Sequence, residues 1–342
     1  MRFLKTLMAI IIVAAIVTGV IYWLRRYKSI EPIPAPPFET KGKLQIFALD
    51  VGQGDGLLIV SPTGKTVLID AGNARAGDSV VAALQRRNLR TLDLVVATHP
   101  HADHIGGLRR VIGKLTVKNL LDSGRNFASD EYEKLLRAVK ERKVNFIVAS
   151  RGQSFDLDSG VKIEAFNPRG DKRWITQVRE GGSVENANSV VLRLSYGNFA
   201  MIFTGDAESE TEAEMLKSKS VLRAQVLKVG HHGSRYATSD KFLNAVNPQA
   251  AIISCGADNR YGHPSQPTLD RLRKAKIQVY RTDLSGEIAV ITDGNTYQIT
   301  PAREANLASL WQGRIEFDDL LLNQPKKAAA SAKGSAKREE ID

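Results

Sequence analysis

The 342-residue chain has a single cysteine, Cys255, which excludes an internal disulfide bond. This cysteine ends the apolar run Ala250-Ala-Ile-Ile-Ser-Cys255, a context typical of a buried structural thiol. Histidine is also scarce, with six in the chain, and acidic residues are outnumbered, 37 against 48 Lys and Arg. The resulting net charge of +11 favours polyanionic partners, either nucleic acid or anionic envelope polymers.

The remaining composition is ordinary, with 43% apolar and 25% charged residues, as in globular proteins. The length suffices for one large domain with a sizeable core or for two ordinary ones. We expect four parts: a cytoplasmic flank and membrane anchor at 1–28, a Pro-rich linker at 29–42, a globular domain at 43–300, and a C-terminal extension with a disordered basic tail at 301–342. The linker includes Glu31-Pro-Ile-Pro-Ala-Pro-Pro37, which is typical of an extended, semi-rigid spacer.

The anchor is predicted from residues 7–24, which carry no charged side chain. A helix that crosses a bilayer takes about 17–25 such residues. Tyr22 and Trp23 stand where interfacial aromatic residues are expected, and basic residues flank the run on both sides. The alternative is a cleaved signal peptide, whose apolar region is shorter, about 7–15 residues, and ends in a small-x-small site. No such site follows Leu24, so an uncleaved single-pass anchor is favoured. The balanced charges leave its orientation open.

Between residues 43 and 300, short apolar runs typical of strands alternate with amphipathic helical patterns. Strands are expected at Leu44–Leu49, Gly56–Val60, Thr66–Ile69, Leu92–Ala97, Val144–Ala149, Val161–Phe166, Val190–Tyr196, Phe199–Thr204, Val226–Val229, Ala250–Ser254, Ile277–Arg281 and Ile288–Thr292. Helices are expected at Asp78–Arg87, with Asp78 as N-cap, and at Asp130–Arg142, Glu208–Lys217 and Pro267–Lys274. The segment Leu307 to Leu322 is expected to add a short helix or strand. The pattern predicts a mixed α/β domain whose polar clusters follow strands.

The six histidines form three clusters, and the first is the most informative. His99, His101 and His104 stand with Asp103 in His99-Pro-His101-Ala-Asp103-His104, directly after a predicted buried strand. Imidazole is the commonest protein ligand for zinc-like metals. Because His99 and His101 are two residues apart, both rings can turn to one side of an extended loop and bind one metal ion. Asp103 and His104 can then bind a second ion beside it. The other clusters are the pair His231-His232 and the lone His263.

Together these sequences resemble a known family. His-x-His-x-Asp-His is the signature of the metallo-β-lactamase fold superfamily, which implies an αββα sandwich of two mixed sheets. Five further strings make the chain similar to the catalytic domain of the ComEC competence proteins over roughly residues 43–300: Leu49-Asp-Val-Gly-Gln-Gly-Asp-Gly56, Leu68-Ile-Asp-Ala-Gly72, Phe203-Thr-Gly-Asp206, Lys228-Val-Gly-His-His-Gly-Ser234 and Asn259-Arg-Tyr-Gly-His-Pro-Ser265. With one predicted span, the chain resembles the hydrolase domain without the channel.

The resemblance implies two divalent ions. His99 and His101 would hold one, Asp103 and His104 the other; Asp206 would bridge them and His231 would complete the second. The family often has a further histidine before the bridging aspartate, and here Asn186-Ala-Asn188-Ser189 stands in that region instead. Asn188 is expected either to coordinate weakly through its amide oxygen or to bond the backbone. Such an oxygen-richer site would accept manganese as well as zinc.

Other residues have supporting roles by resemblance or position. Asp70 is expected to orient the histidine loop, or to be a plain turn residue. His263 is expected to contact the substrate phosphate or to protonate the leaving oxygen, with Asp103 and Asp206 as the other catalytic candidates. Lys228, His232, Ser234 and Arg235 are candidates for substrate contact, and loop hydrogen bonding is the alternative for each. The Gly52-Gln-Gly54 turn is not a dinucleotide fingerprint, because no helix follows it.

The expected reaction is metal-dependent hydrolysis of a phosphodiester, with extracytoplasmic DNA as first choice. By resemblance, a membrane-anchored nuclease would act in DNA uptake or degradation beside a separate uptake channel. A second hypothesis keeps the metals and changes the substrate to an envelope-polymer phosphodiester or a small ester, thioester or lactone. A basic groove would favour the polymer, and a small apolar pocket the ester. A third hypothesis, from another class, is a non-catalytic polyanion-binding module.

Overall fold

The computed structural model describes Thr18 and residues 42–170, 173–218, 220–257 and 259–314. The predicted anchor at residues 7–24, apart from Thr18, the linker at 29–42, apart from Gly42, and the tail from residue 315 onward therefore lie outside the described residues. Within the described ranges, no helix has the length and apolar character needed to span a membrane.

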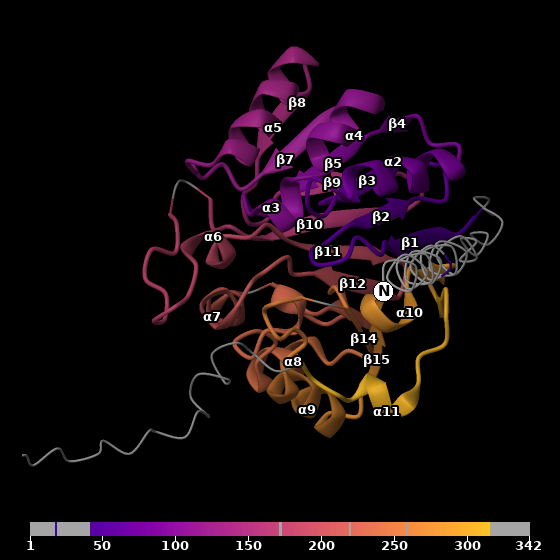
Figure 1. Ribbon diagram of the computed structural model, residues 1–342, viewed down its shortest axis with the longest axis vertical. Coiled ribbons are helices and arrows are strands. Elements are labelled where there is room, and N and C mark those ends of the chain that lie inside the picture. Colours follow the sequence, from indigo (N-terminus) through magenta and orange to yellow (C-terminus); the bar gives the residue numbers. More distant parts are fainter. Residues whose placement is uncertain (1–17, 19–41, 171–172, 219, 258, 315–342) are drawn as a thin grey trace, which may run out of the picture. The chain divides into compact units, whose positions relative to one another are not determined.

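Two mixed β-sheets lie at the centre of the domain (Figure 1). The first sheet contains β1 (Leu44–Ala48), β2 (Leu57–Val60), β3 (Thr66–Ile69), β5 (Leu94–Ala97), β7 (Asn119–Asp122), β8 (Asn145–Val148), β16 (Ile288–Thr292) and β17 (Tyr297–Pro301). Their order is β17-β16-β1-β2-β3-β5-β7-β8. The second contains β9 (Ser154–Asp156), β10 (Val161–Asn167), β11 (Val191–Tyr196), β12 (Phe199–Phe203), β13 (Val226–Lys228), β14 (Ala250–Ile253) and β15 (Gln278–Arg281), in the order β15-β14-β13-β12-β11-β10-β9.

One apolar core joins the facing sides of the two sheets. Ile46, Ile59 and Val96 of the first sheet belong to the same buried cluster as Leu192 and Phe203 of the second. The strands supply this core because alternate side chains of a strand point to one face. Several strands are buried on both faces, as is usual where helices cover the outer sides of a parallel sheet region.

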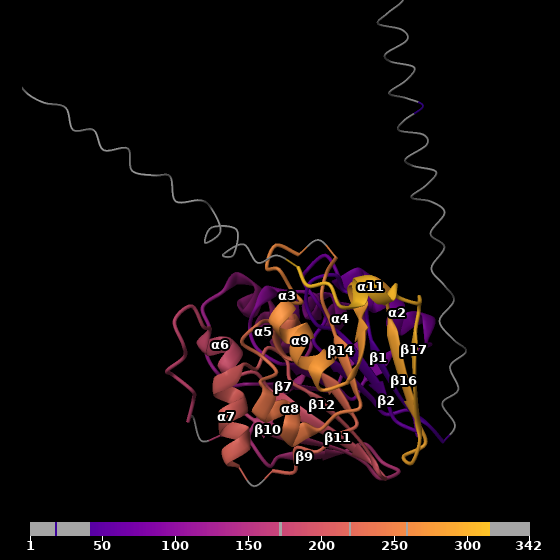
Figure 2. The same ribbon diagram turned by 90° about the horizontal axis from the view of Figure 1, so that it is seen from below.

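Helices form the two outer layers. Figures 1 and 2 show α2 (Gly77–Arg86), α4 (Leu108–Lys114) and α5 (Asp130–Glu141) on the outer side of the first sheet. Over the second sheet lie α7 (Ser209–Lys217), α8 (Asp240–Val246) and α9 (Gln266–Lys274), whose apolar residues share a second buried cluster with those strands. The expected αββα sandwich of two mixed sheets is confirmed.

Several local expectations need correction. Ala76, not Asp78, is the N-cap of α2, and Asp78 lies in the first turn, where its carboxylate pairs with Arg110. The expected strand Leu92–Ala97 is interrupted at Asp93, because the carboxylate of that residue accepts hydrogen bonds from Thr66. The part before the break, β4 (Thr91–Leu92), pairs with β6 (Thr116–Val117) instead.

The C-terminal boundary expected at residue 300 falls inside β17. Residues beyond it belong to the fold: Arg281 donates hydrogen bonds to the carbonyls of Ser309 and Leu310 in α11 (Leu307–Leu310) and of Gln312 in the segment that follows the helix. The segment continues to Arg314, whose backbone N–H donates to the Pro264 carbonyl. It therefore supports the loop that carries His263.

The parallel strands direct the polar clusters to one edge. Within the first sheet β3, β5 and β7 are parallel, and within the second β12, β13 and β14 are parallel. The loops after β3, β5, β12, β13 and β14 carry Asp70, His99, Asp206, His231 and His263 in turn. Ligand sites of open α/β sheets lie outside the carboxyl ends of their strands, and this edge is where the candidate site forms.

Candidate metal centre

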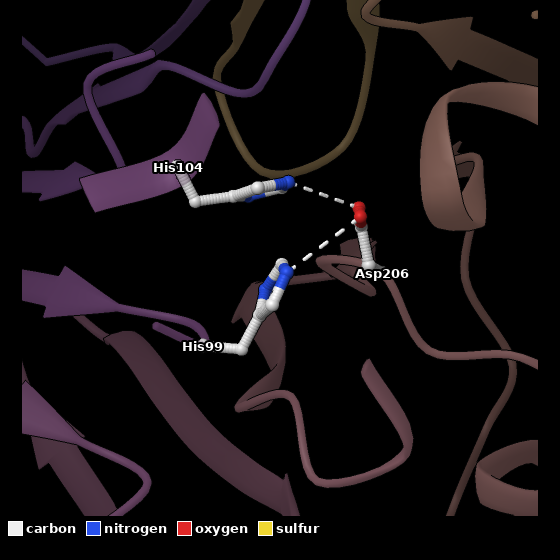
Figure 3. A group of neighbouring side chains, drawn as sticks. All are labelled: His99, His104 and Asp206. Atoms are coloured by element: carbon white, nitrogen blue, oxygen red, sulfur yellow. Dashed lines mark ion pairs between the residues drawn. The ribbon is translucent and has the colours of Figure 1, made fainter. Parts of the chain in front are cut away.

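Asp206 is the meeting point of the histidine clusters. It follows β12 and is 2% exposed, with both carboxylate oxygens facing imidazoles. As Figure 3 shows, His104 and His99 point toward it from the other sheet. His104 Nε2 lies 3.2 Å from Oδ1, and His99 Nε2 lies 3.7 Å from Oδ2. Residues more than 100 positions apart in the sequence thus share one buried centre.

A second group forms on the Oδ1 side of Asp206. His232 Nε2 lies 3.4 Å from Asp206 Oδ1, 3.4 Å from Asp103 Oδ2 and 3.2 Å from His104 Nε2. The backbone at His231 and His232 has positive φ, +44° and +52°, so the 3₁₀ turn η1 (Gly230–Gly233) sends the two rings in different directions. The residue that the structure places among Asp103, His104 and Asp206 is therefore His232, where the sequence indicated His231.

His231 lies instead on the Oδ2 side. Its Nε2 is 3.6 Å from Asp206 Oδ2, the oxygen that also faces His99. His101 is adjacent to His99, with 3.0 Å between His101 Nδ1 and His99 Nε2. The side chains consequently divide about the Asp206 carboxylate into His99, His101 and His231 on one side and Asp103, His104 and His232 on the other.

The spacing of these atoms fits divalent metal ions. In a tetrahedral site with bonds of about 2.0–2.2 Å, ligand atoms stand on the order of 3.3 Å apart. The Nε2–carboxylate separations around Asp206 run from 3.2 to 3.7 Å. The sets His99–His104–Asp206 and Asp103–His104–His232 each bring their ligand atoms within 4.8 Å of one another. The donor set therefore suits zinc-like ions, with the residues on either side of Asp206 as the groups that would hold them.

Partners on Nδ1 fix the orientation of three of the rings. His104 Nδ1 lies 2.8 Å from Asp70 Oδ2, and His231 Nδ1 lies 2.7 Å from Glu208 Oε1. His232 Nδ1 lies 2.9 Å from the Ser254 carbonyl oxygen. Because each partner is an acceptor, the Nδ1 atoms are assigned as donors, which leaves Nε2, the atom directed at Asp206, for a metal ion, as is usual for histidine ligands.

The buried carboxylates around Asp206 favour positive charge on the neighbouring side chains or on a bound ion. Burial alone would lower the pKa of His104, but the carboxylates of Asp206, Asp70 and Asp103 outweigh it and hold that pKa well above its usual value. The carboxylates of Asp206, Asp103 and Asp55 raise the pKa of His232 to about 10, against the effect of burial. The pKa of Asp206 is driven well below its usual range because the imidazoles outweigh burial. Protons and divalent ions compete for such a site, so metal binding is expected to strengthen as pH rises.

Three residues that the sequence offered as ligand or substrate contacts are structural here. The amide of Asn188 accepts from the Ile175 N–H and donates to the carbonyls of Ile175 and Val184, so it holds the preceding loop. Lys228 is completely buried, with Nζ 2.8 Å from Asp55 Oδ2, and cannot reach a substrate. Ser234 is also buried and donates to Glu208, which in turn orients His231.

Sequence reasoning missed the roles of Glu208 and Asn186. Glu208 is 2% exposed and joins His231, Ser234 and Arg179, the last at 2.7 Å. Asn186 is 3% exposed, lines the same cleft, and its Oδ1 has no hydrogen-bond partner among the described residues. It stands in the region where the family often has another histidine.

The centre opens into a cleft of about 970 Å³. Its lining includes three arginines, the exposed Arg75 and Arg260 and the partly buried Arg179, together with the metal-ligand candidates. His263 lines the cleft too, 6% exposed, with its ring centroid 5.1 Å from that of His231. Burial and the neighbouring His231 and His232 lower the pKa of His263 to about 3, so its ring is neutral at pH 7.

Glycines and a tight loop hold the first cluster in place. The loop after β1 lies against α3 (Ala102–Ile105): the Asp55 N–H donates to the Asp103 carbonyl, and a Cβ on Gly54 would stand 2.0 Å from that oxygen. Gly54 has φ +130°, which side-chain-bearing residues rarely adopt. Cys255, by contrast, is a fully buried thiol with no part in the centre.

Comparison with protein families identifies the fold. The family model described as the metallo-beta-lactamase superfamily matches residues 49–257, which include every residue of the two ligand groups. The chain belongs to the metallo-β-lactamase superfamily. Members are generally metal-dependent hydrolases, and their fold typically holds two divalent ions.

Within this superfamily, the chain is similar to proteins named for competence and recombination. The chain is 30% identical to ComE operon protein 3 of Bacillus subtilis over 74% of its length, and 32% identical to competence protein ComA of Neisseria gonorrhoeae over 70%. Recombination protein 2 of Haemophilus influenzae is 28% identical over 81% of the chain. The aligned regions cover 33%, 31% and 32% of these relatives, so the chain matches about a third of each. The expected similarity to ComEC-type competence proteins is confirmed.

Proposed function

We propose that this metallo-β-lactamase superfamily member is a metal-dependent phosphodiesterase that hydrolyses nucleic acid, and that DNA is its main substrate. The observation that carries the proposal is the position of the Asp206 centre in a cleft of about 970 Å³ that also presents Arg75 and Arg260. Exposed guanidinium groups bind phosphate well, and an open cleft with arginines suits a polymer better than a small ester, which a closed apolar pocket would favour.

Each residue of the centre has a defined task in this proposal. Two divalent ions held there would activate a water molecule for attack and would stabilise negative charge on the phosphate oxygens. Asp206, placed between the two histidine groups, would bridge the ions, and Asp103 would complete the second set. Glu208 and Asp70 orient His231 and His104 through their Nδ1 atoms.

His263 is proposed to contact the phosphate or the leaving oxygen. Its Nδ1 has no hydrogen-bond partner among the described residues, and the ring lies beside His231 in the cleft. With a pKa of about 3, the free ring is an acceptor or a neutral donor at pH 7. A role as general acid therefore requires the bound phosphate to raise that pKa, as a nearby negative charge does.

We also propose that the domain acts at the cell membrane, outside the cytoplasm, anchored by the span expected at residues 7–24. There it would meet incoming DNA beside a separate uptake channel. The relative named as a competence protein supports a role with DNA. Protease treatment of intact cells and spheroplasts tests it: digestion of the domain in spheroplasts is expected, and protection until the membrane is lysed would refute the orientation.

Activity is tested with the purified full chain, loaded with Mn²⁺ or Zn²⁺, on labelled single-stranded DNA, duplex DNA and RNA and on bis(p-nitrophenyl) phosphate. Metal-dependent cleavage of a polynucleotide is expected. Asp206→Asn should abolish it without loss of the folded state, and Asp240→Asn, an exposed carboxylate on α8, is the matched control. Cleavage of small esters or lactones alone would favour the second hypothesis. Polynucleotide binding without turnover under any metal would favour the binding module.

A further inference from the structure

We propose that Tyr261 forms a base-binding subsite beside the metal centre, which selects single-stranded polynucleotides. The proposal rests on the proposed phosphodiesterase function and deepens it by naming the substrate class. Among the described residues that line the cleft, Tyr261 is the aromatic side chain left largely open, with 46% of its surface exposed. Every nucleobase offers a flat face that can stack on such an aromatic ring.

The Tyr261 ring is held in place rather than free to swing. It stacks on His263 with an interplanar angle of 25° and a centroid separation of 5.9 Å. The loop beneath it is fixed by Asn259, whose Oδ1 accepts from the backbone N–H groups of Tyr261 and His263, and whose Nδ2 donates to carbonyls on both sides. Ordering the platform in advance lowers the entropic cost of stacking a base on it.

The distance from the metal centre suits a base next to the reacting phosphate. The Tyr261 ring contacts His263, and the His263 ring in turn lies 5.1 Å, centroid to centroid, from His231. The Tyr261 ring is therefore two ring contacts away from His231, a candidate metal ligand. A base that stacks on the Tyr261 ring gives up its stacking on the neighbouring bases of its own strand.

Charge beside the ring matches a phosphate backbone. The Arg260 guanidinium carbon lies 5.2 Å from the Tyr261 ring centroid, and its Nη2 is 3.3 Å from the Tyr261 hydroxyl. Arg260 is exposed, so it can bind a phosphate or cover a stacked base. Arg75 lines the same cleft and provides a second exposed guanidinium. The combination of an aromatic platform with a basic track is the usual way of binding single strands without sequence preference.

This arrangement discriminates against duplexes. In a double helix the bases are stacked and paired, so placing one on Tyr261 requires both the stacking and the pairing to be broken. A base of a single strand has no pairing to break, so its cost of reaching the ring is smaller. The subsite therefore favours single-stranded over duplex polynucleotides, while stacking alone does not distinguish DNA from RNA.

Binding is measured by fluorescence anisotropy with the full chain in a chelating buffer, so that hydrolysis does not deplete the probe. The probes are labelled oligonucleotides of equal length: single-stranded DNA, single-stranded RNA, duplex DNA and an abasic DNA strand that keeps the phosphates. Removal of one stacking platform weakens binding about five- to 150-fold. Tyr261→Ala should show a loss of this size for the single strands, and Tyr261→Trp should retain affinity. Phe146→Ala, an exposed aromatic residue on β8, is the matched control and should bind normally.

The abasic strand separates stacking from charge. If the subsite exists, wild-type protein binds the abasic strand as weakly as Tyr261→Ala binds the normal strand. The DNA and RNA arms show which polynucleotide the cleft accepts. Equal binding of normal and abasic strands, an unchanged Tyr261→Ala variant or a preference for duplex would each overturn the subsite. Tyr261-dependent binding without cleavage under any metal would leave the subsite standing and refute the phosphodiesterase, and cleavage with no effect of Tyr261→Ala would do the reverse.

Discussion

The buried pair of Lys228 and Asp55 gives the sharpest test of how the centre is supported. Nζ of Lys228 lies 2.8 Å from Asp55 Oδ2, and both side chains are at most 1% exposed. Asp55 Oδ1 lies 3.4 Å from His232 Nδ1, so the pair also touches the metal-ligand candidates. Burial would raise the pKa of Asp55, but Lys228 and His232 outweigh it and lower that pKa. Substitution Lys228→Met keeps an unbranched side chain of nearly the same length and removes the charge.

The expected cost is large because the carboxylate keeps its burial and loses its main counter-charge. Breaking one partner of a buried ion pair typically costs about 3–5 kcal/mol. For a domain of this size, 1 kcal/mol corresponds to roughly 2–4 °C in melting temperature. We therefore expect Lys228→Met to lower the melting temperature by about 6–20 °C at pH 7.5. The deficit should shrink toward acidic pH, where protonation of Asp55 removes the unpaired charge.

Thermal and urea unfolding of the full chain measures this, with Lys118→Met as the matched control. Lys118 is 53% exposed and pairs with Asp93 at 2.7 Å, so its loss should cost no more than about 1 kcal/mol. The substrate-contact hypothesis for Lys228 predicts the opposite pattern. Unchanged stability with weaker substrate binding in Lys228→Met would refute the structural role.

Two further changes test other parts of the account. Burial raises the pKa of Asp122 to about 6 against a usual 3.8. Ionisation of this carboxyl therefore lowers the free energy of unfolding by about 3 kcal/mol. The whole loss is present above pH 6, and none of it is present below pH 4. Asp122→Asn, which still accepts from the Tyr132 hydroxyl, should therefore stabilise the protein in urea unfolding at pH 8 but not at pH 4; equal effects at both would contradict this. Gly54→Ala places a methyl group against the Asp103 carbonyl and should weaken metal binding in a calorimetric titration, whereas Gly64→Ala, whose Cβ meets nothing within 4 Å, should leave the titration unchanged. Identical titrations for the two variants would show that the loop does not set the position of Asp103.

Much of the fold was predictable from periodicity because its strands are short apolar runs bounded by turns. The Gly197-Asn198 hairpin is an example: Tyr196 and Phe199 pair across it as the pattern indicated. The strand β7 was missed, although it lies between β5 and β8, because Asn119-Leu-Leu-Asp122 holds only two apolar residues. Its burial comes from neighbours on both sides, which a local pattern does not record.

In the candidate site too, some residues were predictable from the sequence and others were not. Spacing on one loop was enough to group His99, His101, Asp103 and His104, because neighbouring residues on a strand-to-helix loop must stay close. The choice between His231 and His232 depended on two consecutive positive-φ residues, which no spacing rule predicts. The buried position of Lys228 likewise follows from its pairing with Asp55, a contact across 173 residues of sequence between two sheets.

The most direct test of the account is the metal content of the purified full chain, measured by inductively coupled plasma mass spectrometry after equilibration with Mn²⁺ or Zn²⁺ and removal of free ions. The account predicts two equivalents per chain, no more than one in Asp206→Ala, and two in the control Asp240→Asn. A wild-type chain that retains no divalent ion, or an Asp206→Ala variant that retains both, would contradict it.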